Sequence, residues 1–242
     1  GIDPVIEKIR EKPEEFPMII KNLIAVTRSA ATFALSLTAC GGKSSDSSAG
    51  SSSESTTVKL GVVGSIYEDL WKPAQDSLKK EGIDLEIVQF SDYATPNNAL
   101  NSGDIDLNAF QHQIYLDNEV EQQGYKIESI GYTFIIPLNI YSHKVKAISD
   151  IKDGDVVAIP DDVTNGGRAI KVLAAAGLIT LKEDAGFNPT LDDIETYNTK
   201  ITIKELKANT IPSVLDDVTA AVVNGNYALD FGLKTKEAIY KD

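Results

Sequence analysis

The feature that most restricts the fold is an alternation of strand-like and helix-like segments that starts at residue 58, is interrupted by a long apolar stretch at 127–142, and then starts again. Strands that alternate with helices form mostly parallel sheets flanked by helices. Two such blocks joined by one extended segment predict an α/β protein with two lobes and a cleft between them. From apolar spacing, strands are expected at 58–63, 84–90, 105–110, 155–159, 194–197, 201–206 and 219–223, and helices at 67–80, 95–101, 166–176 and 211–217.

The lobe boundaries follow from the same pattern. We expect lobe 1 at 58–142, lobe 2 at 143–224, and a return of the chain to lobe 1 at 225–242. The stretch 127–142 is too long for one ordinary strand and is expected to run between the lobes. Because ligands in open α/β sheets bind beyond the carboxyl ends of the strands, the loops that follow strands are the candidate site.

The segment before the first strand has the layout of a lipid-anchored protein. Residues 18–39 combine two basic residues, a short apolar stretch and small residues before Cys40, as in a bacterial lipoprotein signal peptide. The four residues that end at Cys40 resemble the lipobox at which a cysteine is acylated. Residues 40–57 are rich in serine and contain no large apolar residue, so they are predicted to form a flexible tether. We interpret 1–17 as an upstream extension, and expect Cys40 to anchor the protein on the extracytoplasmic face of the cell membrane.

The composition argues against several functions. The formal net charge is -13, and an acidic surface repels phosphate, so nucleic acid is not an expected partner. One cysteine and two histidines leave no intrachain disulfide and no expected metal site or cofactor. The acidic pairs at 161–162, 192–193 and 216–217 lack metal-ligand spacing and are interpreted as solvated or helix N-terminal acids. We expect a monomer.

An anion site is predicted at Thr164-Asn165-Gly166-Gly167-Arg168, directly after an expected strand. Glycines permit a close approach of backbone to a ligand, and a helix N-terminus offers free N–H groups with a partial positive charge. The guanidinium of Arg168 matches the geometry of a carboxylate. The alternative is a surface loop whose arginine pairs with a neighbouring acid.

Aromatic and polar residues follow three other expected strands. Phe110, His112 and Tyr115 follow the third strand of the first block, and Tyr93 follows the second. Aromatic rings would enclose an apolar ligand side chain, and the imidazole would hydrogen-bond to it or to its carboxylate. Asn224 ends the last strand, where an amide accepts from an ammonium group and donates to a carboxylate. Taken singly, His112 also fits a structural histidine and the others fit turn residues, so one site is predicted only if the loops converge.

Four motifs occur in a fixed order along the chain. They are Phe-Ser-Asp-Tyr-x-x-Pro-Asn at 90–97, Leu-Asn-Ala-Phe-Gln-His at 107–112, Thr-Asn-x-x-Arg-Ala at 164–169 and Ala-Val-Val-Asn-Gly-Asn-Tyr-Ala at 221–228. Together these motifs resemble those of the MetQ/NlpA methionine-binding lipoproteins. The resemblance runs from about the lipobox to the end of the chain. It implies a two-lobed periplasmic-binding-protein fold of type II, L-methionine as ligand, and an ABC importer, permease and ATPase together, as partner.

The resemblance also implies roles for the predicted site residues. Arg168 would hold the ligand carboxylate, assisted by Asn165 and Asn224, and Asn224 would also contact the amino group. The residues that would line the side-chain pocket are Tyr93, Phe110, His112 and Tyr115. Members of the family continue with another strand and a terminal helix, so the C-terminal part of lobe 1 is expected to be truncated at Asp242.

Other functions stay open at this point. The same fold would serve another amino acid or a methionine-containing dipeptide. An enzyme with His112 as base lacks a nucleophile, a metal set or a cofactor loop in the sequence, and we expect no enzyme. A surface adhesin is compatible with the serine-rich tether.

Overall fold

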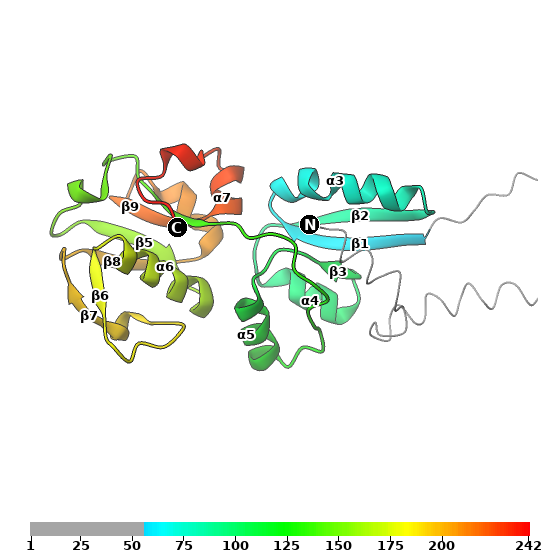
Figure 1. Cartoon of the computed structure of the whole chain (residues 1–242), viewed down its shortest axis with the longest axis horizontal. Helices are drawn as coiled ribbons and strands as arrows, with labels where there is room; N and C mark the ends of the chain where they lie inside the picture. The colour runs from blue at the N-terminus through cyan, green and yellow to red at the C-terminus, as the bar shows by residue number, and fades with distance from the viewer. Residues whose placement is uncertain (1–55) are drawn as a thin grey trace, which may run out of the picture.

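Two lobes stand side by side in the protein, joined by a single extended crossing (Figure 1). The structure, a computed structural model, describes residues 56–242. The predicted extension at 1–17, the predicted signal peptide at 18–39, and Cys40 with nearly all of the predicted tether lie outside the described residues. No helix among the described residues is long and apolar enough to span a membrane.

Lobe 1 is a three-stranded parallel sheet in the order β2-β1-β3. Its elements are β1 (Thr56–Val63), α3 (Ile66–Lys79), β2 (Ile83–Phe90), α4 (Thr95–Ser102), β3 (Leu107–Asn108) and α5 (Gln113–Gln123). Helix α3 packs on the sheet through residues spaced three and four apart, a spacing that puts them on one helix face; they are Tyr67, Trp71, Ala74 and Leu78. Strand β3 is much shorter than the expected 105–110, because it is an edge strand that pairs with β1 at only two positions.

Lobe 2 is a four-stranded sheet in the order β4-β9-β5-β8, with a separate antiparallel pair β6-β7. Its strands are β4 (Leu138–Tyr141), β5 (Val156–Pro160), β6 (Ile179–Leu181), β7 (Ile194–Tyr197), β8 (Thr202–Leu206) and β9 (Ala220–Asn224). Its helices are α6 (Val163–Ala175), α7 (Gly225–Asp230), and the 3-10 turns η3 (Ile148–Asp150), η4 (Leu191–Asp193), η5 (Ala208–Val214) and η6 (Thr235–Glu237). Strands β8 and β9 run parallel to β5, and β4 runs antiparallel to β9.

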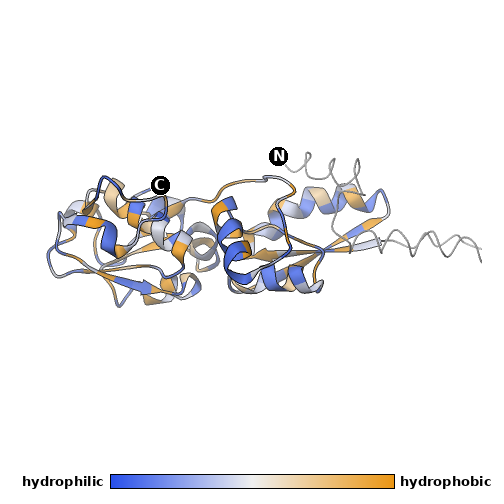
Figure 2. Ribbon diagram, turned by 90° about the horizontal axis from the view of Figure 1, so that it is seen from below, coloured by the Kyte–Doolittle hydropathy of each residue, from blue (hydrophilic) through white to orange (hydrophobic). Residues whose placement is uncertain are grey.

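The core of lobe 2 shows the two-residue period of a sheet covered on both faces. Val222 and Val157 face α6, and Val223 and Ala158 face η5 and α7. Apolar residues are accordingly concentrated along the strands (Figure 2). The 3-10 form of η5, where a helix at 211–217 was expected, agrees with Pro212 inside it, which lacks a backbone donor.

The stretch 127–142 crosses from lobe 1 to lobe 2, as expected (Figure 1), but its strand and the lobe boundary differ from the prediction. Only Leu138–Tyr141 of the stretch 127–142 forms a strand, and this strand pairs with β9, so the chain joins the second sheet before the boundary expected at 142. The segment 225–242 also differs. Helix α7 contacts α3, but Tyr240 pairs with Ile140, so the tail stays on the sheet of lobe 2 instead of returning to lobe 1.

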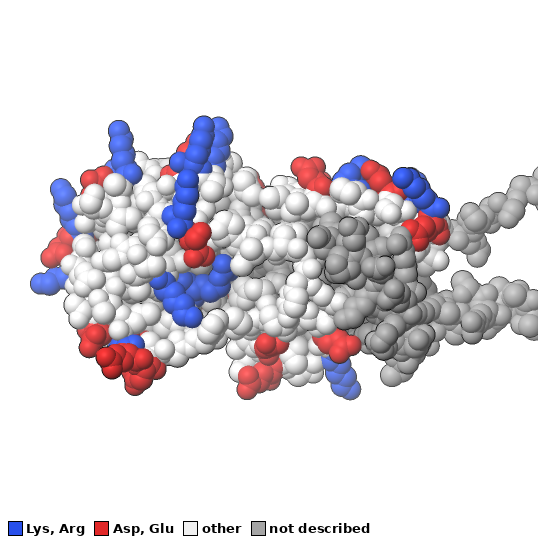
Figure 3. Space-filling view, in the orientation of Figure 1, with Lys and Arg blue, Asp and Glu red and all other residues white. Residues whose placement is uncertain are grey.

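Charged side chains of both signs lie on both lobes, while the surface that joins the lobes is mostly uncharged in the view of Figure 3. No group of histidine, cysteine, aspartate or glutamate among residues 56–242 is arranged to hold a metal ion.

Candidate ligand-binding cleft

A cavity of about 1270 Å³ lies between the lobes and is lined by residues of both. All seven predicted binding residues line it, and none is turned to the outer surface; they are Tyr93, Phe110, His112, Tyr115, Asn165, Arg168 and Asn224. The cavity is larger than the roughly 300–1,000 Å³ of ordinary small-molecule pockets. It continues past the aromatic residues to Leu60 and Trp71 of lobe 1.

A chain of three hydrogen-bonded polar side chains stands on the lobe 2 side of the cavity, and two of them, Asn165 and Asn224, line it. Asp162 caps the N-terminus of α6 by accepting the backbone N–H of Asn165 at 2.9 Å, and its two oxygens accept from Asn165 Nδ2 at 3.1 Å each. Asn165 Oδ1 in turn accepts from Asn224 Nδ2 at 3.0 Å. Asn165 and Asn224 are only 3% and 6% exposed, so these bonds are made away from water.

The order of these bonds sets which atoms face the ligand. An ionised carboxylate only accepts, so Asn165 must turn its Nδ2 toward Asp162 and its Oδ1 toward Asn224. Asn224 must then turn its Nδ2 toward Asn165. Its Oδ1 is left buried without a hydrogen-bond partner among the described residues. A buried acceptor without a partner costs free energy unless a donor reaches it, and an ammonium group is such a donor.

Arg168 lies one turn into α6 and supplies the positive charge of the cleft. Its Nη1 is 3.4 Å from Asn165 Oδ1, and its Nη2 is 3.9 Å from a carboxylate oxygen of Asp242. The side chain is 24% exposed, so most of it is removed from water. The sequence left two interpretations of Arg168 open, a role in a ligand site and pairing with a nearby acid. The structure shows both features, since Arg168 lines the cavity and has one acid within ion-pair distance.

The wall from lobe 1 is aromatic. The ring of Tyr93 stacks on Phe110 at a centroid distance of 5.9 Å and meets Tyr115 edge-on at 6.1 Å. Tyr227 of α7, which belongs to lobe 2 and is not among the lining residues, contacts Tyr93 at a centroid distance of 4.8 Å. Burial raises the pKa of the phenols of Tyr93 and Tyr115 above the usual value, so both stay neutral and present apolar faces.

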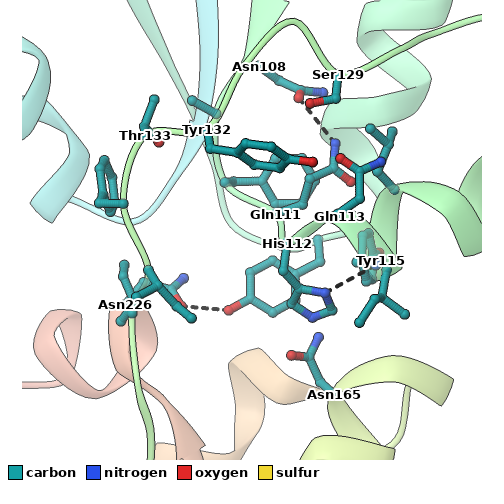
Figure 4. A pocket seen from close by; sticks show the side chains of 18 of the residues that line it. Asn108, Gln111, His112, Gln113, Tyr115, Ser129, Tyr132, Thr133, Asn165 and Asn226 are labelled. Atoms are coloured by element: carbon teal, nitrogen blue, oxygen red, sulfur yellow. Dashed lines mark hydrogen bonds between the residues drawn. The ribbon is translucent and has the colours of Figure 1, made fainter. Parts of the chain in front are cut away.

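His112 stands at the junction of the two walls, opposite Asn165 (Figure 4). It is the N-cap of α5, and its Nδ1 accepts the backbone N–H of Tyr115 at 3.1 Å. A neutral imidazole has one donor and one acceptor nitrogen, so Nε2 carries the proton. Nε2 is buried and has no hydrogen-bond partner among the described residues. It is therefore a donor available to an acceptor in the cleft.

The neutral state of His112 has clear physical causes. Burial lowers the pKa of the imidazole below its usual value, and the positive charge of Arg168 lowers it further, against smaller opposing effects of Asn165 and Asp162. Two cations in one small cleft would repel each other. The ring therefore donates a hydrogen bond without adding charge.

The glycines of α6 have a different role from the predicted one. A Cβ on Gly167 would lie 2.9 Å from the Cα of Asn188, and a Cβ on Gly166 would lie 3.0 Å from the carbonyl oxygen of Pro160. They let the helix pack closely on β5 and on the loop that holds Asn188, and neither glycine is among the residues that line the cavity. The predicted free N-terminus is also partly filled, because Asp162 already accepts from the first turn.

Residues beyond the prediction hold the site in place. Asn226 accepts from the Tyr93 hydroxyl and donates to the carbonyl of Val63 at 3.1 Å, so it joins both lobes. Asn97 is fully buried and bonds to the side-chain amide of Gln111, which steadies the turn that carries His112. Asn226 was within a quoted motif, but its position two residues after the end of β9 gave no sign that it faces Tyr93.

Comparison with known proteins identifies relatives over the whole of the described chain. The NlpA lipoprotein family matches residues 58–242. Outer membrane lipoprotein 3 of Mannheimia haemolytica is 40% identical over 221 residues, which cover 90% of this chain and 80% of the relative. The D-methionine-binding lipoprotein MetQ of Salmonella typhimurium is 43% identical over 187 residues, 76% of this chain and 69% of the relative.

Solved structures agree in fold as well as in sequence. A nutrient binding protein from Burkholderia cenocepacia bound to methionine has a TM-score of 0.73 and 45% identity, covering 76% of this chain and 79% of that one. The neighbours are substrate-binding proteins with the two-lobed type II fold, which confirms the predicted fold class. The chain belongs to the NlpA lipoprotein family.

Proposed function

We propose that this protein captures methionine in the cleft between its lobes and delivers it to an ABC importer. The observation that carries the proposal is the pair of unpartnered buried atoms beside Arg168, the donor His112 Nε2 and the acceptor Asn224 Oδ1. A cation, a neutral donor and an acceptor together match the two charged ends of an α-amino acid. The relatives named as D-methionine-binding, and the related structure bound to methionine, support this choice of ligand.

The proposed roles follow from these positions. Arg168 binds the ligand carboxylate through its planar fork, and Asn165 keeps the guanidinium in place. Asn224 Oδ1 accepts from the ammonium group. The ligand side chain lies among the rings of Tyr93, Phe110 and Tyr115, where a thioether gains about 0.3–1.5 kcal/mol from sulfur–aromatic contact.

A second ligand class is favoured by one observation, the size of the cavity. Its extension toward Leu60 and Trp71 leaves room beyond a single amino-acid side chain. A methionine-containing dipeptide would use that room while keeping its carboxylate on Arg168. The proposed mechanism in either case is binding and closure of the lobes, without chemical conversion, and the relatives are named as binding proteins.

Calorimetric titration with a matched ligand set tests the proposal. The set contains L-methionine, D-methionine, norleucine, leucine and a methionine-containing dipeptide. We expect one site per chain, tighter binding of methionine than of norleucine, which lacks the sulfur, and a negative heat-capacity change from apolar burial. Heat with leucine or the dipeptide and none with either enantiomer of methionine would reassign the ligand.

We also propose that Cys40 anchors the protein to the membrane, on its extracytoplasmic face, as a monomer. The signal-like segment before Cys40 and membership of a lipoprotein family support the anchor. Growth with an alkyne-labelled fatty acid should label the native chain and leave a Cys40→Ala variant unlabelled. Labelling of both variants would place the lipid elsewhere, and light scattering of detergent-solubilised protein tests the monomer.

A further inference from the structure

One face of helix α7, in lobe 2, forms hydrogen bonds with the turn between β1 and α3 of lobe 1. Asn226 and Asp230 are four residues apart on α7 and therefore lie on the same side of the helix. Asn226 Nδ2 donates to the carbonyl of Val63 at 3.1 Å. Asp230 Oδ1 accepts from the backbone N–H of Ser65 at 2.9 Å and from its hydroxyl at 2.6 Å.

The contact at Asp230 is charge-assisted and lies at the N-terminus of α3. Ser65 is the N-cap of α3 and its own side chain does not cap the helix. The carboxylate from the other lobe therefore sits at the positive end of a 14-residue helix. Hydrogen bonds to a charged group contribute about twice as much as neutral ones.

The turn at 63–65 leaves little space between Gly64 and the side chains of α7. Gly64 has φ +106°, and a Cβ there would lie 3.0 Å from Asp230 Oδ2 and 3.3 Å from the Cβ of Asn226. A side chain at position 64 would be strained at this positive φ and would crowd the side chains of Asp230 and Asn226. The backbone at 63–65 is thus shaped to receive α7, and this is a lobe-to-lobe contact made without any cleft residue that we assign to the ligand.

We propose that Asp230 and Ser65 form a clasp that holds the two lobes in the closed arrangement. The proposal rests on the proposed function, in which closure accompanies ligand binding. The clasp acts on the equilibrium between open and closed forms, so it changes the apparent affinity without touching the ligand. Asp230 is accordingly a positioning residue.

The inter-lobe distance measures the clasp directly. Spin labels are placed at Lys79→Cys, at the end of α3, and at Glu195→Cys, on β7, in a Cys40→Ser background; both sites are exposed. Pulsed dipolar spectroscopy without ligand is then compared for the native clasp and for Asp230→Asn. We expect the variant to populate longer distances and to return to the shorter ones when saturated with methionine.

Affinity gives the second readout. Asp230→Asn should raise the Kd for methionine about threefold to tenfold, the effect of weakening an exposed charge-assisted hydrogen bond. Ser65→Ala keeps the backbone donor and should have a smaller effect, and the double variant should be no weaker than Asp230→Asn alone. Asp217→Asn removes the same charge from an exposed position of lobe 2 and should leave both readouts unchanged.

The two proposals fail in different ways. If methionine does not bind to the native chain, the proposed ligand is wrong, but the distances measured without ligand still test the clasp. If Asp230→Asn has the same distance distribution and the same Kd as Asp217→Asn, the clasp is overturned, and the contact is only a fixed part of the hinge.

Discussion

Replacement of Arg168 by methionine tests the electrostatic half of the site. Methionine keeps the length of the aliphatic stem on α6 and removes the guanidinium. Within the described residues the loss of protein contacts is small, since the guanidinium bonds to Asn165 at 3.4 Å and lies 3.9 Å from Asp242. The fold should therefore survive the change, and a ligand carboxylate should lose its main partner.

The magnitude follows from burial and competition. Truncating one partner of a desolvated, hydrogen-bonded charge pair costs about 2–5 kcal/mol. Arg168 is 24% exposed and already has Asp242 as a neighbouring acid, so we expect the low end, about 2–3 kcal/mol. At 1.4 kcal/mol per factor of ten, this raises the Kd for methionine about 30- to 150-fold.

The assay is calorimetric titration with two comparison variants. Arg168→Lys keeps the charge and loses the fork, and should fall between the native chain and Arg168→Met. Lys171→Met removes the same charge one turn later on α6, where the ammonium group lies 3.7 Å above the ring of Phe187, and should change the Kd by less than about threefold. An Arg168→Met Kd within threefold of the native value, or equal losses in both Met variants, would refute direct contact of Arg168 with the carboxylate.

Three further results are expected. Methionine affinity should be constant from pH 8 to about 6.5 and fall only at lower pH, because the pKa of His112 is lowered from 6.5 and protonation turns its Nδ1 from the acceptor that caps α5 into a donor. In the same acid range the unfolded chain takes up a proton before the folded chain does, so His112 makes the unfolding free energy decrease as the pH falls below 6.5. Gly167→Ala should lower the unfolding free energy in urea by about 1–3 kcal/mol because its Cβ would meet backbone of Asn188, while Gly186→Ala, which meets nothing within 4 Å, should stay within about 0.5 kcal/mol of the native chain. Asp162→Asn should leave the melting temperature nearly unchanged, since asparagine caps helices equally well, yet raise the Kd about tenfold by releasing the orientation of the neighbouring amides.

Elements with a strong apolar period could be predicted from the sequence. Strand β5 and helix α3 were expected within one or two residues of where they lie, because each buries a regular face. Helix α5 could not be predicted, since only Tyr115 and Leu116 of its residues are buried and no apolar stripe runs along it. It is instead defined by its ends, the His112 cap and Gly124 with φ +69°.

For the stretch 127–142 the sequence predicted the crossing between the lobes but not where its strand begins. The stretch is apolar, yet Tyr132 is 78% and Ile135 is 86% exposed. Apolar character alone does not distinguish a paired strand from an extended surface segment, because pairing depends on a partner strand far away in the chain. Only Leu138–Tyr141 has such a partner, β9.

The sequence predicted which residue types lie at the site, but not which of their atoms act there as hydrogen-bond donors and which as acceptors. The expectation that candidate residues follow the carboxyl ends of strands picked out seven residues that all line the cavity, because parallel strands bring those ends to one edge of the sheet. It did not show which atom of each amide faces the ligand, because an isolated asparagine offers a donor and an acceptor equally. That choice is made by Asp162, which appears in the sequence only as one of several acidic pairs.

Asp162 also explains how a helix N-terminus can serve a zwitterion. An open N-terminus presents only donors and so favours an anion alone. Here the Asp162 carboxylate accepts from the backbone N–H and from the Nδ2 of Asn165. Asn165 Oδ1 then accepts from Asn224 Nδ2, so the last free atom of the chain, Asn224 Oδ1, is an acceptor. The positive charge is then supplied separately by Arg168. Because the acceptor and the cation come from side chains on different elements, the spacing between them is set by how α6 packs on the sheet of lobe 2. A ligand with only one of the two charged groups would leave a buried partner unsatisfied.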